Sequence, residues 1–176
     1  TACYKWLLSP PGAGYLYVKE ELIEKFEPPF VGWASVKPEV FETIDFWDIY
    51  SLKLSETASR FEVGSPSFIS LTGATEALKM LLNIGIEKIE RRILKLTDRL
   101  IEAVKDFGLK LQAPEETQYR SGIVNFKIDR PQEVVEKLSR KGIVVSARAR
   151  GMRVSPHFYN TKEEIDKLVE EIKQCG

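Results

Sequence analysis

Apolar side chains recur with helical spacing over a long stretch in the middle of the chain. From residue 68 to 107 they fall on one helical face, and after Ile89 they repeat every three or four residues. Asn83 and Gly85 interrupt this stretch, so the pattern predicts two consecutive helices. Gly108 follows the last apolar position, where a glycine cap is expected.

The following residues alternate between strand and helix patterns. Asp129 and Pro131 predict the start of a helix, and Gly142 predicts its end. Thr161 and Glu164 have the spacing of a capping box at the start of a final helix. Three short apolar runs predict strands, at residues 122–128, 143–147 and 152–155.

The N-terminal third shows weaker periodicity. Residues 12–18 form an apolar and aromatic run after a proline-rich turn, which predicts a strand. Residues 19–26 have helical spacing, and Pro28 ends the helix they predict. Residues 29–64 are irregular and rich in aromatic rings, so we expect a loop-rich region pressed against another surface.

Composition excludes several classes of protein. The 176 residues hold 26 basic and 26 acidic side chains, a balance that argues against nucleic acid or an anionic membrane as a partner. No apolar run approaches the ~18 residues of a membrane span. Cys3 and Cys175 lie at opposite ends, so neither a disulfide framework nor a metal site is predicted. Without a signal-like N-terminal region, we expect a cytoplasmic protein.

Lys5 is the first candidate for chemistry. It lies between the rings of Tyr4 and Trp6 and beside an apolar run, which predicts a partly desolvated amine. A neutral lysine amine can form a Schiff base with a carbonyl compound. The alternative is a solvated surface lysine before a turn.

A glycine–serine pair ahead of the long helical stretch is the second candidate. Gly64 and Ser65 could offer backbone N–H groups and a hydroxyl to a phosphate. In the alternative, Ser65 caps the helix and Pro66 is its first residue.

Arg153 is the third candidate. It alternates with Met152 and Val154, so its side chain should lie on the opposite face of its strand and could bind a carboxylate with a planar fork. A structural ion pair is the alternative. His157 has no carboxylate or cysteine at a telling spacing, so a structural role is expected.

The order of these motifs resembles the class V aminotransferase family. This family is a branch of the fold-type I pyridoxal-phosphate enzymes that includes cysteine desulfurases, selenocysteine lyases and isopenicillin N epimerase-like proteins. The resemblance covers the whole chain, and its strongest motifs are residues 4–7, 12–18, 60–66 and 152–161.

The resemblance implies an α/β fold that forms the C-terminal part of such an enzyme. Residues 1–67 would be the remnant of the large cofactor-binding domain, 68–111 the connecting helices, and 112–176 the small C-terminal α/β domain. The cofactor-stacking ring and the aspartate that pairs with the pyridine nitrogen are not found ahead of Lys5.

The resemblance also implies roles for single residues. Lys5 corresponds to the lysine that forms a Schiff base with pyridoxal 5'-phosphate, and Tyr4 to a phosphate-binding position. Gly64 and Ser65 correspond to a pair that reaches the phosphate of the partner's cofactor in a homodimer. Arg153 corresponds to the arginine that binds the carboxylate of the amino-acid substrate. Ala2 replaces a phosphate-binding serine found in many relatives.

Departures from the family pattern favour an aminotransferase or epimerase over a desulfurase. Cysteine desulfurases carry a nucleophilic cysteine in a loop before the substrate arginine, and only residues 148–152 separate Ala147 from Arg153 here. A cysteine desulfurase or selenocysteine lyase-type lyase stays an alternative, as does a non-catalytic fragment. A nucleic-acid or protein-binding module would depend on Arg148, Arg150 and Arg153, and the balanced charge disfavours it.

Overall fold

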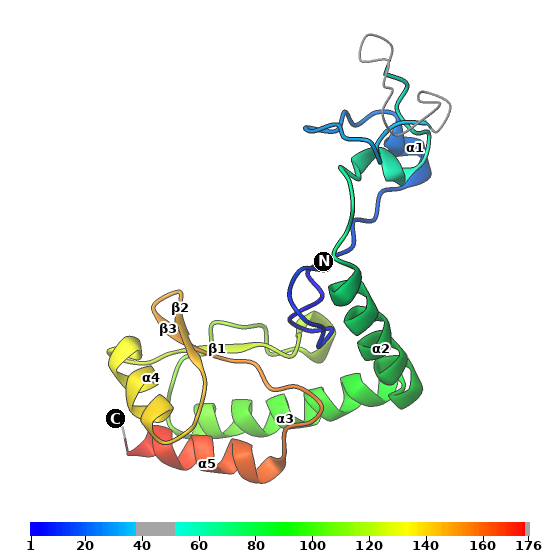
Figure 1. Cartoon of the computed structure of the whole chain (residues 1–176). Coiled ribbons are helices and arrows are strands. Elements are labelled where there is room, and N and C mark those ends of the chain that lie inside the picture. The colour runs from blue at the N-terminus through cyan, green and yellow to red at the C-terminus, as the bar shows by residue number, and fades with distance from the viewer. Residues whose placement is uncertain (38–51, 175–176) are drawn as a thin grey trace. The chain divides into compact units, whose positions relative to one another are not determined.

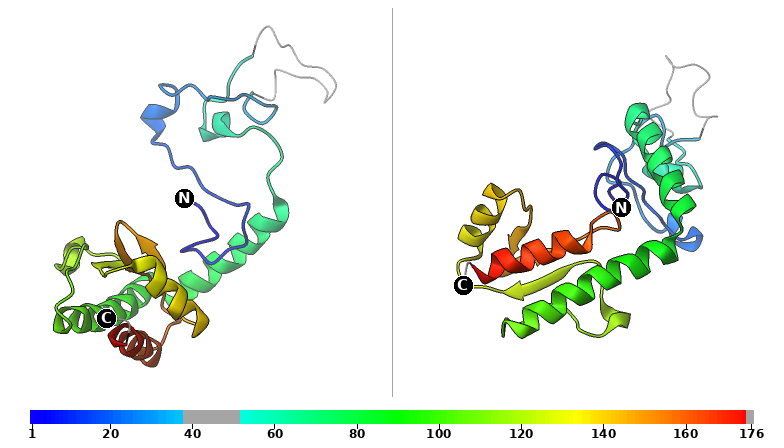
Figure 2. Two further views of the ribbon diagram at one scale, coloured as in Figure 1. Left: turned by 90° about the vertical axis from the view of Figure 1, so that its left-hand side faces the viewer. Right: turned by 90° about the horizontal axis from the view of Figure 1, so that it is seen from below.

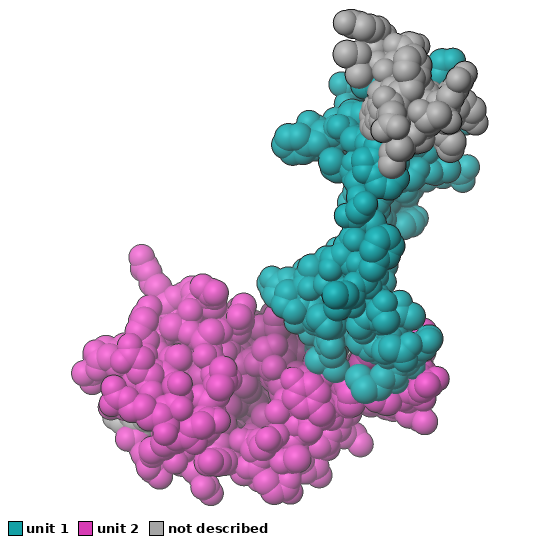
Figure 3. Space-filling model, viewed as in Figure 1, with its two compact units in different colours: residues 1–80 teal, residues 81–176 magenta. Residues whose placement is uncertain are grey.

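The computed structural model describes residues 1–37 and 52–174. The chain divides into two compact units, residues 1–80 (unit 1) and 81–176 (unit 2) (Figure 3). The elements follow in the order α1 (Glu20–Ile23), η2 (Ala58–Phe61), α2 (Phe68–Ile84), α3 (Ile86–Asp106), η3 (Thr117–Tyr119), β1 (Val124–Lys127), α4 (Pro131–Arg140), β2 (Ser146–Arg148), β3 (Gly151–Val154) and α5 (Lys162–Lys173) (Figure 1).

Unit 2 is an antiparallel three-stranded sheet with helices against one face. The strand order is β1-β3-β2. Helices α3 and α5 lie side by side, and α4 packs on β2 and β3 (Figures 1 and 2). One continuous core joins the sheet to the helices, and it consists of Leu96, Leu100, Ile101, Val104, Val124, Phe126, Val134, Leu138, Met152, Val154, Ile165, Leu168 and Ile172.

The helical predictions for this part of the chain are largely confirmed. Gly85 has a φ of 95° between α2 and α3, and Gly108 has a φ of 70° just after α3, so each ends a helix in a conformation that favours glycine. Thr161 and Glu164 form both hydrogen bonds of the capping box of α5. Helix α4 begins at Pro131, as the sequence predicted, and its N-cap residue is Arg130, which has a left-handed backbone.

The strand predictions are right in number for unit 2 but imprecise in their bounds. The run 122–128 forms β1 over Val124–Lys127. The predicted strand 143–147 begins later, as β2 over Ser146–Arg148, because only these residues pair with β3 in a tight hairpin.

Unit 1 has little core of its own. Its small cluster of buried apolar residues consists of Cys3, Ala13 and Ala74, with Leu7 and Leu71 packed against it. Three residues of the apolar run 12–18 and one ring of the aromatic segment are exposed instead: Tyr15, Leu16, Tyr17 and Phe30.

Two elements predicted for unit 1 are much reduced. The strand predicted over 12–18 is wrong, because only Gly14 forms a β-bridge, with Ala2, and no described residue pairs with 16–18. The helix predicted over 19–26 is confined to α1, because residues 24 and 25 form a turn that ends it.

The aromatic segment is irregular where it is described. Phe30 and Trp33 are exposed, so the expected packing of these rings on another surface is not found within the described residues. Phe61 is half-buried in η2. The other rings of the prediction, Phe41, Phe46, Trp47 and Tyr50, lie outside the described residues.

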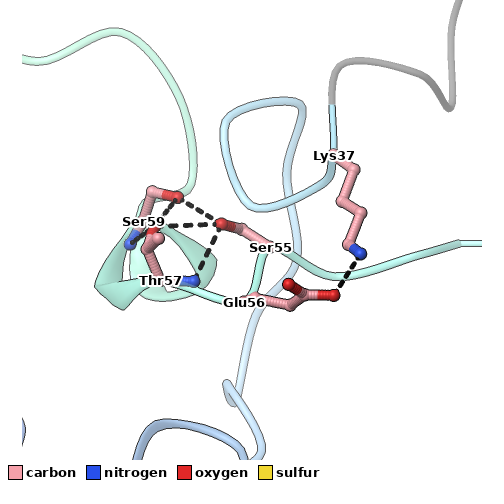
Figure 4. A network of polar contacts seen from close by, with 5 residues as sticks. All are labelled: Lys37, Ser55, Glu56, Thr57 and Ser59. Atoms are coloured by element: carbon pink, nitrogen blue, oxygen red, sulfur yellow. Dashed lines mark hydrogen bonds and ion pairs between the residues drawn. The ribbon is translucent and has the colours of Figure 1, made fainter. Parts of the chain in front are cut away.

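Polar contacts hold the described ends of this segment together. Val36 and Leu54 form an antiparallel bridge, and the Lys37 amine pairs with the Glu56 carboxylate (Figure 4). The hydrogen bond from Lys37, followed by its charge, lowers the pKa of Glu56. The hydroxyls of Ser55, Thr57 and Ser59 bond to one another beside this pair (Figure 4).

Candidate active site

Lys5 lies at the tip of a closed turn. The Ser9 N–H donates to the Cys3 carbonyl at 3.1 Å, and the Leu8 N–H donates to the Lys5 carbonyl at 3.1 Å. Cys3 is fully buried at the base of the turn. Leu8 has a φ of 56°, in the left-handed region that is unfavourable for a leucine. The fold therefore fixes the backbone of Lys5 tightly.

The N-terminus of α2 fixes the other end of this turn. The Ser70 hydroxyl donates to the Pro11 carbonyl at 2.6 Å. The Pro10 ring lies so close to Gly73 that a Cβ there would come within 2.6 Å of Pro10 Cδ. Residues 3–9, which we call the lysine turn, therefore pack together with the first turns of α2 within unit 1.

The side chain of Lys5 is more solvated than the sequence suggested. Lys5, Tyr4 and Trp6 are all exposed, so the predicted partial desolvation is wrong for this chain. The Lys5 amine lies 5.6 Å from the centroid of the Tyr4 ring, within cation–π distance. None of the ion pairs among the described residues uses this amine, which leaves it free for a covalent partner.

Gly64 and Ser65 lie on the extended segment ahead of α2. A Cβ on Gly64 would lie 3.1 Å from Trp33 Nε1, so the glycine allows close approach of the indole. Ser65 does not cap the helix, because α2 begins at Phe68 and the Ser67 carbonyl accepts the N–H of Leu71. The exposed Ser65 hydroxyl takes part in none of the hydrogen bonds among the described residues.

Arg153 lies at the centre of the sheet in unit 2. Its neighbours Met152 and Val154 are buried, whereas Arg153 is half-buried on the opposite face, as the alternation predicted. Asn125 on β1 and Ser146 on β2 lie directly opposite Arg153 in the register. Arg153 Nε donates to the Ser146 hydroxyl at 3.1 Å. The terminal guanidinium nitrogens form none of the ion pairs among the described residues, so the ion-pair alternative is not supported.

A two-residue turn joins β2 to β3. Arg148 pairs with Gly151, and the residues between them, Ala149 and Arg150, have φ values of 51° and 58°. Both values match a type I′ turn, which usually contains glycine or asparagine. The side-chain amide of Gln112 donates to the Ala149 carbonyl at 3.3 Å and helps to hold this turn.

His157 has the structural role that the sequence predicted. It is buried, its Nδ1 accepts the N–H of Phe158 at 2.9 Å, and its ring stacks on Tyr159 with centroids 5.2 Å apart. The Asn160 side chain accepts the His157 N–H at 2.8 Å. These contacts order the chain that leads from β3 into α5.

The candidate residues fall into two groups. Lys5, Tyr4, Gly64 and Ser65 belong to unit 1, and Arg153 belongs to unit 2. No described hydrogen bond joins the lysine turn to the glycine–serine pair. Ser146 was missed by sequence reasoning, because its pairing with Arg153 depends on a turn that lacks glycine and asparagine.

Solved structures define the class of this fold. The chain superposes on the apo cysteine desulfurase of Thermococcus onnurineus NA1 with a TM-score of 0.85 and 25% identity, covering 99% of this chain and 45% of that one. It superposes on the cystine C-S lyase C-DES with a TM-score of 0.82 and 23% identity, covering 97% and 44%. The fold is that of part of a fold-type I pyridoxal-phosphate enzyme.

The sequence comparisons give the family. The family model for aminotransferase class-V matches residues 2–168. The Bacillus subtilis protein named "Uncharacterized aminotransferase YcbU" is 31% identical over 96% of this chain and 42% of its own length. A Pyrococcus abyssi protein named "Probable cysteine desulfurase" is 28% identical over 94% and 43%. The chain belongs to the class V aminotransferase family, whose cofactor is pyridoxal phosphate, and it spans less than half the length of these relatives.

Residues 1–37 and 52–174 contain no helix long and apolar enough to cross a membrane. The same residues contain no group of three or more acidic, histidine or cysteine side chains that could hold a metal ion.

Proposed function

We propose that this chain is the C-terminal portion of a homodimeric pyridoxal-phosphate enzyme that exchanges an amino group between an amino acid and a 2-oxo acid. The observation that carries this proposal is the environment of Arg153, the residue that would bind the substrate. Arg153 offers unpaired guanidinium nitrogens next to a two-residue turn that contains no cysteine. A location in the cytoplasm stays part of the proposal.

Lys5 would be the residue that holds the cofactor. Its amine is free of ion pairs among the described residues, and its backbone is fixed by the closed turn, so it fits a covalent role. When bound, pyridoxal phosphate supplies an electron sink for bond cleavage at the α-carbon of an amino acid. The Nζ of Lys5 would accept the proton that leaves the α-carbon of the substrate.

Arg153 would orient the amino acid. The hydrogen bond from Nε to Ser146 fixes the plane of the guanidinium and leaves its two terminal nitrogens for a bidentate contact with the α-carboxylate. A substrate held at this end presents its α-carbon in a defined position, which lowers the entropic part of the barrier.

Phosphate binding would be shared between two protomers. Tyr4 would donate its phenol hydrogen within its own protomer. Gly64 and Ser65 would offer an N–H and a free hydroxyl to the cofactor of the partner, which agrees with their lack of described hydrogen bonds to the lysine turn.

The cysteines argue against the desulfurase alternative that some relatives' names suggest. Cys3 is fully buried at the base of the lysine turn, where a thiol cannot reach a substrate. Cys175 lies outside the described residues, and in the sequence it follows Arg153 by 22 positions, so it is not part of the β2–β3 turn. Desulfuration needs an accessible thiolate that attacks the substrate sulfur.

The reaction can be tested with the purified protein supplied with cofactor. We expect 2-oxo acid to form from a mixture of amino acids plus an acceptor oxo acid, with no sulfide released from cysteine. Arg153→Gln should raise KM for the amino acid at least ~10-fold, and the matched control Arg140→Gln, on the exposed surface of α4, should leave it unchanged. If sulfide is released from cysteine faster than 2-oxo acid is formed, the desulfurase alternative is favoured.

A non-catalytic fragment is the second candidate, and the exposed apolar groups of unit 1 favour it. Leu16, Tyr17 and Phe30 have no described packing partners that bury them. In that case the chain would bind cofactor weakly and self-associate. Cofactor affinity and oligomer size, measured on this chain, separate the two candidates: micromolar affinity contradicts the fragment.

A further inference from the structure

One face of the sheet in unit 2 carries an unbalanced set of positive charges. The face opposite the core presents alternate residues of each strand: Asn125 and Lys127 from β1, Gly151 and Arg153 from β3, and Ser146 and Arg148 from β2. The segment beside β1 extends this face, because Leu111 bridges Phe126 toward the core and so turns Lys110 and Gln112 outward. We call these eight residues the cationic sheet face.

Acidic residues are absent from this face. Lys110, Lys127, Arg148 and Arg153 give it four positive charges, and its other members are neutral. None of the ion pairs among the described residues uses any of these four side chains. A surface with four positive charges and no acid among its residues attracts anions, so the face is suited to an anionic ligand.

Arg148 is the cation best placed to act together with Arg153. Ser146 pairs with Arg153, and Arg148 is two residues further along the same strand, so the two arginines are diagonal neighbours on one face. Diagonal neighbours lie ~7–8 Å apart at the backbone, within reach of long side chains. Arg148 lies opposite Gly151, so no cross-strand side chain separates the two guanidinium groups.

The backbone at Gly151 excludes a side chain from this position. A Cβ there would lie 2.4 Å from the Phe126 carbonyl and 2.8 Å from Asn125 Oδ1. The hairpin that carries Arg148 is also held in place: the Asn125 amide donates to the Arg148 carbonyl at 3.4 Å, and Gln112 donates to Ala149. Ala149 and Arg150 in this turn both have positive φ values, which is a strained backbone for residues other than glycine. The hydrogen bonds from Asn125 and Gln112 help to hold this strained turn.

We infer that the substrate is dicarboxylic: Arg153 binds the α-carboxylate, and Arg148 binds a second carboxylate on the side chain of the amino acid or oxo acid. This inference rests on the proposed function, because it takes Arg153 as the carboxylate-binding residue. Two guanidinium groups at diagonal positions on one face of the sheet can each bind one end of a short diacid. Lys127, on the neighbouring strand, adds electrostatic attraction for the anion.

Binding of simple acids to this chain tests the inference without the cofactor. The probes are glutarate, a five-carbon diacid, and butyrate, a monoacid, at equal ionic strength, and the readout is the shift of the arginine Nε–H signals in NMR spectra. We expect glutarate to bind about tenfold more tightly than butyrate. Arg148→Gln should remove this preference and leave the affinity for butyrate unchanged, and Arg140→Gln should preserve both.

The outcomes separate the two proposals. If Arg148→Gln retains the preference for glutarate, the inference is overturned. If Arg153→Gln leaves butyrate binding unchanged while Arg148→Gln still removes the preference, the carboxylate role of Arg153 in the proposed function fails, but the binding role of Arg148 survives. Circular dichroism of each variant confirms that unit 2 is folded, and Arg148→Lys should restore part of the preference by charge alone.

Discussion

The two units of this chain differ in how many large apolar side chains they bury. In unit 2, a three-stranded sheet and helices α3, α4 and α5 enclose one continuous apolar core. In unit 1, the buried apolar cluster consists of three small residues, while many large apolar side chains are exposed. Burial of apolar area is the main source of stability, so unit 2 should be the more stable of the two, and unit 1 should depend on specific hydrogen bonds and close contacts.

This difference matches the roles proposed for the units. Unit 2 offers a rigid sheet for binding the substrate carboxylates, whereas unit 1 carries the lysine on a short turn fixed by backbone hydrogen bonds. Exposed apolar side chains in unit 1, such as Leu16 and Tyr17, would suit a surface for protein contacts.

The largest effect expected on stability comes from equal truncations in the two units. Leu100 is fully buried in the core of unit 2, and Leu16 is 66% exposed in unit 1. Leu100→Ala should lower the free energy of unfolding by about 2–5 kcal/mol, and Leu16→Ala should change it by less than about 0.5 kcal/mol. Urea unfolding followed by circular dichroism measures both losses. Equal losses would contradict the view that unit 2 is stabilised by its apolar core and unit 1 is not.

Loss of the capping box should have a smaller effect, confined to unit 2. The Thr161 hydroxyl accepts the Glu164 N–H at 3.2 Å at the start of α5. Thr161→Ala should cost about 1 kcal/mol, because this N–H loses its partner. Ser139→Ala, an exposed control on α4, should cost almost nothing. A cost no larger than that of the control would show that α5 does not need its cap.

The smallest effect expected is a dependence of unit 2 on pH. Hydrogen bonds from the Thr161 N–H and then from the Asn160 amide lower the pKa of Glu164 from its ordinary value of 4.5. The unfolded chain therefore binds this proton first, so the stabilisation is complete above pH 4.5 and is lost as the pH falls through the lower folded-state pKa. Urea midpoints measured from pH 6 to 3 should decline, and less steeply for Glu164→Gln. Parallel curves would contradict this role of Glu164.

The sequence predicted the fold best where burial has a strong period. Ile93, Leu96 and Leu100 repeat on one face of α3, and Gly85 ends the preceding helix, so both helices were predictable. The strand over 12–18 was not, because an apolar run does not reveal whether a partner strand is available. The late start of β2 has a similar cause, because pairing is fixed by the hairpin turn rather than by the apolar run.

The candidate site was predictable to a similar degree. Alternation along β3 was enough to place Arg153 on the polar face. Its partner Ser146 could not be predicted, because the turn at Ala149 and Arg150 lacks the residues that usually mark a two-residue hairpin. The exposure of Lys5 was missed, because neighbouring rings in sequence do not guarantee burial in the fold.

The most direct test of the central proposal asks which lysine carries the cofactor. The protein is incubated with pyridoxal phosphate, reduced with borohydride, digested and analysed by mass spectrometry. We expect the added mass of the reduced cofactor on the peptide that contains Lys5, in the parent protein and in the exposed-lysine control Lys25→Ala, and no added mass in Lys5→Ala. Labelling that persists in Lys5→Ala, or that falls mainly on another lysine, would contradict the assignment.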